Sequence, residues 1–468
     1  MSIAPIGLLT IMIGVICLQL GYRATVTTLI VATLFGSAAA ILIGSANIPP
    51  AHLLLAFVAT ATLSRRFEMS GAIGAMSFPK PGFWLMCLVI YGVATGILMP
   101  RLLAGSTPII PLGTSEYADT GSTVPLGPVS SNFTQGVYLV ADFVCFAMIV
   151  AIASTRAGFA TITSALVAYA AGNVLFALLD LGTYTTGTQW TLEFMRNAQY
   201  TLHIDEEVGG LKRIVGSFTE ASAFAHSTLG ALGFTGTLWL CGFRPALTGT
   251  LALASLFLVV LSTSSTGLAG TPPVLLILYA TALMRRGFHP SRPYTSAAVL
   301  CAPLLVIAVV LAAQLDSEAS EPIRRYIDDL IFSKSASSSG IERSAWNTFG
   351  LQNFFDSYGL GVGLGTVRTS SFAVALLSNV GIPGTIFYLL FAGSAFGRLR
   401  GIPRSSWADV RLAARNACLG LIIADTFAGT TVEQGLLFYV LAGLACAEPE
   451  RHTAGLSPAP MRQVVART

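Results

Sequence analysis

The sequence predicts an all-α, polytopic integral membrane protein. Hydrophobic residues make up 54% of its 468 residues and charged residues only 10%, with a mean hydropathy of +0.72. This is more apolar surface than one water-soluble core can bury. The apolar residues come in runs of roughly 15 to 25, the length that crosses a hydrocarbon core. These runs lack the alternation of barrel strands, and backbone groups in lipid must be satisfied locally, so we expect helices.

About thirteen membrane-spanning helices are expected, within one domain that covers residues 1–447. They cover residues 5–21, 26–44, 50–64, 83–100, 134–153, 159–181, 222–243, 247–262, 267–284, 295–313, 372–396, 410–427 and 433–447. All seven cysteines fall inside these spans. We therefore expect them to be small core side chains and not disulfides or metal ligands.

The distribution of basic residues predicts the orientation, because Lys and Arg are retained on the cytoplasmic side of short loops. When the spans are threaded in order, one side collects Arg65, Arg66, Lys80, Arg156, Arg244, Arg285, Arg286, Arg292, Arg398, Arg400, Arg404, Arg411, Arg451, Arg462 and Arg467. We predict that this side is the cytoplasm and that residues 448–468 are a disordered cytoplasmic tail. Three long loops, 101–133, 182–221 and 314–371, then lie outside the cytoplasm.

The third long loop is polar and cationic, although it lies between two long apolar spans. It carries Arg324, Arg325, Lys334, Arg343 and Arg368. Apolar residues at positions 323, 326, 327, 330 and 331 predict a helix with one apolar stripe, lying on the membrane or capping the bundle. A second periodic stretch begins at Arg343. Asn347 follows one turn later, so both side chains can face one ligand.

Two glycine-rich segments follow, Gly359–Gly365 with the sequence GLGVGLG and Gly381–Gly384 with the sequence GIPG. The first lacks the preceding strand and the spacing of a dinucleotide or phosphate loop. We expect its glycines to let the backbone pack tightly against a helix. The alternative is that its amides help to hold a diphosphate at the start of the following helix.

The segment RIVGSFTEASAFA, from Arg213 to Ala225, precedes and enters an apolar span. Taken alone, Arg213 is a solvated charge or a lipid headgroup contact, and Glu220 stabilises a helix N-terminus. The functional alternatives are a guanidinium that binds a phosphate diester through two parallel donors and a carboxylate that acts as a general base. His226 stands six residues after Glu220, so the two do not share a face of a straight helix.

Together these segments resemble the O-antigen ligase and Wzy-type polymerase superfamily of lipid-linked glycan transferases, over roughly residues 205–390. The resemblance implies a GT-C-like helical bundle, an undecaprenyl-diphosphate-linked glycan donor, no metal or other cofactor, and arginines outside the cytoplasm that grip the diphosphate. The polymerase branch commonly has an acidic residue, proline and serine where this chain has Glu220, Ala221 and Ser222. Ligases place a His-Asn pair about eleven residues before the Gly-Ile-Pro-Gly run, where this chain has Ser370 and Ser371.

The residues that match this pattern define the expected site. Glu220, Arg213 and Arg343 are the catalytic candidates, the carboxylate as base and the arginines as stabilisers of the departing diphosphate. The substrate-binding candidates are Arg368, Asn347, Lys212 and His226. Asp328 and Asp329 diverge by about 100° as adjacent helical residues, which disfavours a metal site there.

The expected function is polymerisation of undecaprenyl-diphosphate-linked repeat units into exopolysaccharide or O-antigen, at the periplasmic face of the bacterial inner membrane. The expected partners are the lipid-linked donor and acceptor, the bilayer, a chain-length regulator and a flippase, with no nucleic acid. Two alternatives stay open. An O-antigen ligase would pass the glycan to lipid A-core, and a transporter or lipid flippase would use intramembrane Asp142 and Asp425 with broken helices.

Overall fold

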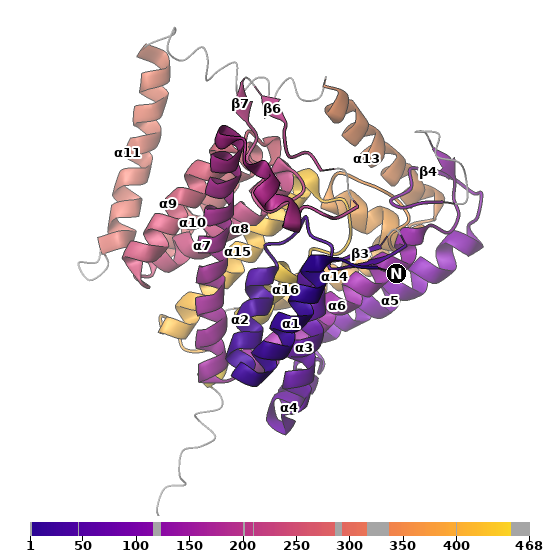
Figure 1. Ribbon diagram of the computed structural model, residues 1–468, viewed down its shortest axis with the longest axis horizontal. Coiled ribbons are helices and arrows are strands. Elements are labelled where there is room, and N and C mark those ends of the chain that lie inside the picture. The colour runs from indigo at the N-terminus through magenta and orange to yellow at the C-terminus, as the bar shows by residue number, and fades with distance from the viewer. Residues whose placement is uncertain are drawn as a thin grey trace, which may run out of the picture.

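The computed structural model (Figure 1) describes residues 2–44, 46–115, 123–199, 202–208, 210–285, 293–315, 337–398 and 400–450. Most of these residues are helical. The predicted helix at 323–331, Asp328, Asp329 and most of the predicted tail lie outside the described residues.

The first half of the chain forms α1 (Pro5–Leu20), α2 (Tyr22–Ala32), α3 (Pro50–Leu63), α4 (Arg66–Ala75), α5 (Pro81–Leu102), α6 (Ser130–Ala153) and α7 (Arg156–Thr186). The second half forms α8 (Ala221–Leu240), α9 (Pro245–Leu261), α10 (Ser265–Met284), α11 (Pro293–Leu315), α13 (Ser338–Asp356), α14 (Phe372–Phe396), α15 (Ser406–Ala428) and α16 (Leu436–Cys446). Several helices begin at a proline, whose fixed φ suits the first helical position and whose missing N–H has no partner there to lose.

Five of the described helices, α5, α6, α7, α10 and α14, are long and apolar enough to cross a membrane. Shorter apolar helices include α1, α3, α9 and α16. This composition indicates an all-α, membrane-embedded protein, in agreement with the expected fold class. The count of thirteen spans is not confirmed.

The span predicted over residues 26–44 is wrong. Helix α2 ends at Ala32, and residues 41–43 form strand β2 (Ile41–Ile43), which pairs with β1 (Ser2–Ile3) and β3 (Ala46–Ile48). The residues between α2 and β2, including Leu34 and Ala38, are buried inside the protein. Burial in a protein core and burial in lipid select the same apolar side chains, so this run satisfied the prediction without crossing a bilayer.

Helix α8 lies at the centre of the bundle and packs against α9, α10 and α15. The main apolar core extends from α2 and α3 through α6, α7 and α8 to α14, α15 and α16. None of the seven cysteines, all of which lie in the described residues, forms a disulfide, and Cys17, Cys145 and Cys418 are buried as expected. Cys301 is exposed on α11, so the expectation of a core side chain is wrong there. Arg411 holds Glu450 through two hydrogen bonds of 2.9 and 2.6 Å, so the predicted tail is anchored up to that residue.

The glycine-rich segment packs against a break in α14. Gly381 leaves the helical region with φ 60° and ψ −163°, and the amide N–H of Val362 donates to the Ser378 carbonyl across the junction. A Cβ on Gly361 would stand 2.6 Å from the Gly381 nitrogen, and one on Gly381 would stand 2.3 Å from the Gly359 carbonyl oxygen. These separations leave no room for a side chain, which confirms the expectation of tight backbone packing.

Parts of all three long loops gather at one end of the bundle (Figure 1). The first loop forms a hairpin of β4 (Pro108–Ile109) and β5 (Val124–Pro125). The second forms the 3₁₀ helix η1 (Gln189–Met195) and a hairpin of β6 (Glu207–Val208) and β7 (Leu211–Lys212). The third contributes α13, whose Asn353 amide donates to the Pro108 carbonyl of the first loop at 2.7 Å.

Candidate functional site

Glu220 lies where the second loop enters α8. It is the N-cap residue of that helix, with extended backbone angles of φ −155° and ψ 164°. Its carboxylate makes no capping bond to a backbone N–H and instead accepts the hydroxyl of Ser222. Its side chain therefore lacks the hydrogen bond that defines a helix cap.

Arg368, in the third loop, contacts the first loop. Its backbone N–H donates to the Ile110 carbonyl at 3.0 Å. Its exposed guanidinium lies over the ring of Trp346 on α13, 4.1 Å from the ring centroid, within cation–π range. The backbone bond and the ring together fix where this charge stands.

Three charged groups act electrostatically on Arg368. The pKa of the Arg368 guanidinium is lowered, mainly because its surroundings partly desolvate it. The negative charges of Glu342 and Glu220 act to raise this pKa, and the positive charge of Arg343 acts to lower it. The guanidinium stays charged at neutral pH, because the pKa of arginine lies far above 7. We call Glu220, Glu342, Arg343, Trp346 and Arg368 the loop cluster. It combines two cations with two carboxylates, of which Glu220 lies at the mouth of α8.

Asn347 orients the backbone that follows Arg368. Its side-chain oxygen accepts the backbone N–H of Ser370 at 2.8 Å. The Thr369 hydroxyl lies 3.4 Å from the carbonyl oxygens of Gly429 and Thr430, in the linker between α15 and α16. Asn347 thus positions the segment that carries Arg368, and the same segment contacts the α15–α16 linker.

Arg213 is engaged within the second loop. Its guanidinium donates to Glu206, and its backbone N–H donates to the Glu206 carbonyl at 3.0 Å. His203 lies 2.6 Å from the same carboxylate. Burial alone would raise the pKa of Glu206, but the charges and hydrogen bonds of Arg213 and His203 hold it below its usual value. The guanidinium of Arg213 is therefore already paired within its own loop.

Lys212 is buried and bound to Asp180 of α7. The ammonium lies 3.3 Å from one Asp180 oxygen, and Arg196 donates to the other at 2.7 Å. The backbone N–H groups of Val215 and Gly216 complete this set at 2.9 and 3.1 Å. Asp180 therefore ties η1, β7 and the approach to Glu220 to one point. The geometry makes Lys212 a positioning residue and leaves it no contact with the loop cluster.

His226 lies deeper on α8, away from the loop cluster. Its Nε2 is 3.0 Å from an oxygen of Asp425 on α15. The other Asp425 oxygen accepts the side-chain amide of Gln434 at 2.9 Å, and Gln434 in turn accepts the Tyr388 hydroxyl at 2.8 Å. The polar contacts of His226 therefore belong to a network inside the bundle.

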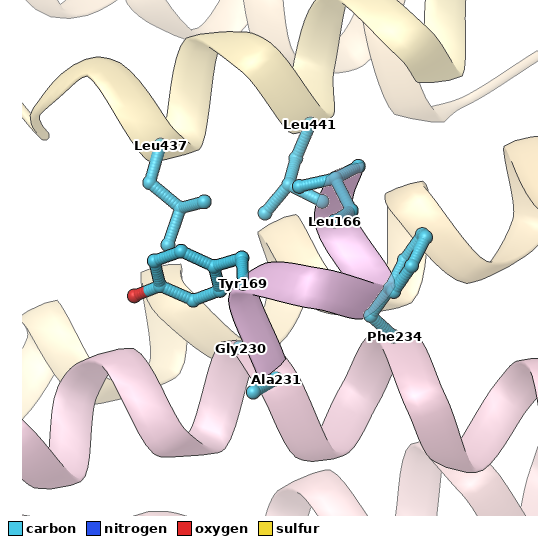
Figure 2. A pocket seen from close by; sticks show the side chains of 7 residues that line it. All are labelled: Leu166, Tyr169, Gly230, Ala231, Phe234, Leu437 and Leu441. Carbon is cyan, nitrogen blue, oxygen red and sulfur yellow. The ribbon is translucent and has the colours of Figure 1, made fainter. Parts of the chain in front are cut away.

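Two cavities in the described part of the chain are lined mainly by apolar groups, which suits a glycan poorly. The first, between α7, α8 and α16, measures about 10 Å³ and is lined mainly by apolar groups (Figure 2). Its one hydroxyl, on Tyr169, binds Ser227 at 2.9 Å. The second, of about 310 Å³ between α1, α2 and α3, is mainly apolar and suits a hydrocarbon chain better than a diphosphate. The loop cluster is therefore identified by its charged side chains and not by a cavity.

Sequence reasoning missed several partners at this end of the protein. Glu342 and Trp346 flank Arg343 on α13, but only the structure brings them to Arg368. The pairing of Asp180 with Lys212 and Arg196 was not predicted either. The spacing of Trp346 three residues after Arg343 was the available signal, because it places both on one helical face.

The fold and the loop cluster define a helical, membrane-embedded protein with a charged site at one end. No protein-family model and no curated protein matches this chain.

Proposed function

We propose that this protein is a metal-independent glycosyltransferase that polymerises undecaprenyl-diphosphate-linked repeat units into exopolysaccharide or O-antigen. The observation that carries the proposal is the loop cluster, where Glu220 from the second loop and Arg343 from the third both lie within electrostatic range of Arg368. A carboxylate beside two arginines suits a reaction in which a hydroxyl loses a proton while an anionic diphosphate departs.

In this mechanism Glu220 removes the proton from the acceptor hydroxyl. The oxygen attacks the anomeric carbon of the growing chain, and the bond to the diphosphate carrier breaks. Arg343 and Arg368 stabilise the charge that develops on the departing diphosphate, which favours the transition state over the ground state. Arg213 joins them once the diphosphate displaces Glu206, since both ligands are anions that accept from the same guanidinium fork.

Arg343→Lys and Arg368→Lys should each lower polymer formation by about tenfold or more. Lysine keeps the charge but loses the paired donors, and a hydrogen bond to a charged group is worth about 1.5 kcal/mol or more. The assay is ladder formation by purified protein with lipid-linked repeat units. Arg404→Lys, at an exposed position outside the loop cluster, is the matched control. Wild-type ladders from both cluster variants would remove the arginines from the mechanism.

We further propose that the loop cluster faces the periplasm and that the protein resides in the inner membrane, because the short basic loops are expected in the cytoplasm. A cysteine at Ser344, exposed on α13, should react with an impermeant thiol reagent in intact spheroplasts, whereas one at exposed Ile402 should not. The unsubstituted protein reports the background from native cysteines. Labelling at residue 402 alone would invert the orientation.

Deletion of the gene tests the pathway step directly. A polymerase mutant should accumulate single repeat units on undecaprenyl diphosphate, which analysis of membrane lipids detects. Accumulation of long lipid-linked chains would indicate the ligase alternative instead. In this chain Ser370 donates its backbone N–H to Asn347 at the position where ligases have histidine, so the ligase reaction would need another base.

A transporter or lipid flippase is the second candidate, because α14 is broken at Gly381 and several acidic side chains lie inside the bundle. Broken helices and buried carboxylates mark ion sites in many transporters. The convergence of three large loops at one end favours the enzyme, since a carrier needs its site near the midplane. Movement of labelled lipid-linked glycan across proteoliposomes, without ladder formation, would reverse this choice.

A further inference from the structure

A pair of carboxyl groups lies inside the bundle, away from the loop cluster. Asp142, on α6, is fully buried. Its side chain is in hydrogen-bond contact with Glu433, in the linker between α15 and α16. Among the described residues no donor group reaches either Asp142 oxygen. Two ionised carboxylates have no hydrogen atom to share, so a hydrogen bond between these two groups needs one bound proton.

The surroundings supply no cation that would replace this proton. The charged and titratable groups that interact with the pair are Asp425 of α15, His226 of α8, Tyr439 of α16 and Cys145 of α6 itself. No arginine or lysine is among them. His226 is already paired with Asp425 at 3.0 Å. Two adjacent negative charges without a counter-ion are costly in a medium of low dielectric.

A second observation points to a ligand at this place. Tyr439 is fully buried, interacts electrostatically with Asp142 and Glu433, and its hydroxyl has no hydrogen-bond partner among the described residues. A buried hydroxyl without a partner costs about 1–3 kcal/mol. Either carboxyl group would serve as that partner after a small movement, so the hydroxyl marks a site where the hydrogen-bonding pattern changes.

Access to the pair runs through side chains that reach the accessible surface. Glu433 is half-buried, and the side chains of His226 and Asp425 are 24% and 13% exposed. Asp142 alone has no exposure. We propose that Asp142 and Glu433 form a proton-binding site, in which one proton is held between the two carboxyl groups at neutral pH and exchanges with solvent past His226 and Asp425.

Glu433 lies in the linker between α15 and α16, which also contacts the third loop. The backbone N–H of Gly435 donates to the Glu433 carboxylate at 2.8 Å, and Gly435 has φ 78°, a conformation that glycine adopts without strain. Loss of the proton leaves two like charges in contact, and the linker is the part that can move. The same linker receives the Thr369 hydroxyl beside Arg368. The linker therefore connects the Asp142–Glu433 site to the segment that carries Arg368.

Infrared difference spectroscopy of the purified full-length protein tests the site without an activity assay. A protonated carboxyl group has a C=O stretching band that shifts when H₂O is replaced by D₂O. We expect such a band at pH 7 in the wild type. It should be lost in Asp142→Asn, whose amide donates to Glu433 as the protonated acid does, and in Glu433→Gln, whose amide donates to an ionised Asp142. Glu193→Gln, at an exposed position, is the control and should keep the band.

Each other outcome overturns the proposal. A band that persists in both variants belongs to another group, and a band lost only in Asp142→Asn shows that the proton is not shared. A band that appears only after Na⁺ is removed would make this a metal-cation site. Circular dichroism checks that each variant is folded, and Glu433→Gln supplies the result if Asp142→Asn does not fold. Neither reading depends on polymer formation, so failure of the proposed function would leave this test intact.

Discussion

Glu220→Gln should slow polymer formation by about 10²- to 10⁴-fold, the usual effect of removing a general base. Glutamine has nearly the same size and still accepts the Ser222 hydroxyl, but it cannot take a proton from the acceptor. The carboxylate makes no capping bond to the backbone, so the substitution removes no hydrogen bond from the helix end. The measurement is the initial rate of ladder formation from lipid-linked repeat units.

Two controls separate a base from a structural carboxylate. If Glu220 only stabilises the start of α8 through its charge, the glutamine variant should lose at most about 1 kcal/mol of stability and keep its rate. Ser222→Ala removes the hydroxyl that contacts Glu220 and should have a much smaller effect than Glu220→Gln. If Glu220→Gln formed ladders at the wild-type rate, Glu220 would not be the general base. If a chelator inhibited the wild type, the reaction would not be metal-independent.

Helix positions could be predicted well from apolar runs, because both lipid and a protein interior exclude polar side chains over a helix length. The predicted span 372–396 coincides with α14, and the predicted span 50–64 with α3 to within one residue. The break at Gly381 was not predicted, because the glycine-proline spacing does not show which backbone will approach it. The region 26–44 failed for a related reason, since hydropathy does not distinguish lipid from the buried loop that Leu34 and Ala38 occupy.

The site was predicted less completely, because its contacts join residues far apart in the chain. Glu220 and Arg343 were found from local pattern and resemblance, and the structure brings both to Arg368. The assignment of Lys212 to substrate was local too, and it missed a partner 32 residues away. A basic residue in a loop gives no signal that it is buried. Its role is decided by which acid the fold places beside it.

Asp180→Ala should lower the free energy of unfolding by about 3–5 kcal/mol, the usual cost of breaking a buried ion pair by removing one partner. Arg196 and Lys212 would be left buried without a counter-charge, since their side chains are 2% and 3% exposed. The N–H groups of Val215 and Gly216 would also lose their acceptor. Thermal unfolding of the purified protein in detergent measures the loss.

The pair formed by Glu206 and Arg213 is the matched control, because the Glu206 side chain is 40% exposed. Glu206→Ala should cost at most about 1 kcal/mol, as exposed ion pairs do. Lys212→Met in the Asp180→Ala background removes one stranded charge and should recover part of the lost stability. Equal melting temperatures for Asp180→Ala and Glu206→Ala would show that Asp180 does not anchor the second loop. Glu220 would then need another support, because the anchored residues Val215 and Gly216 lead directly to it along the chain.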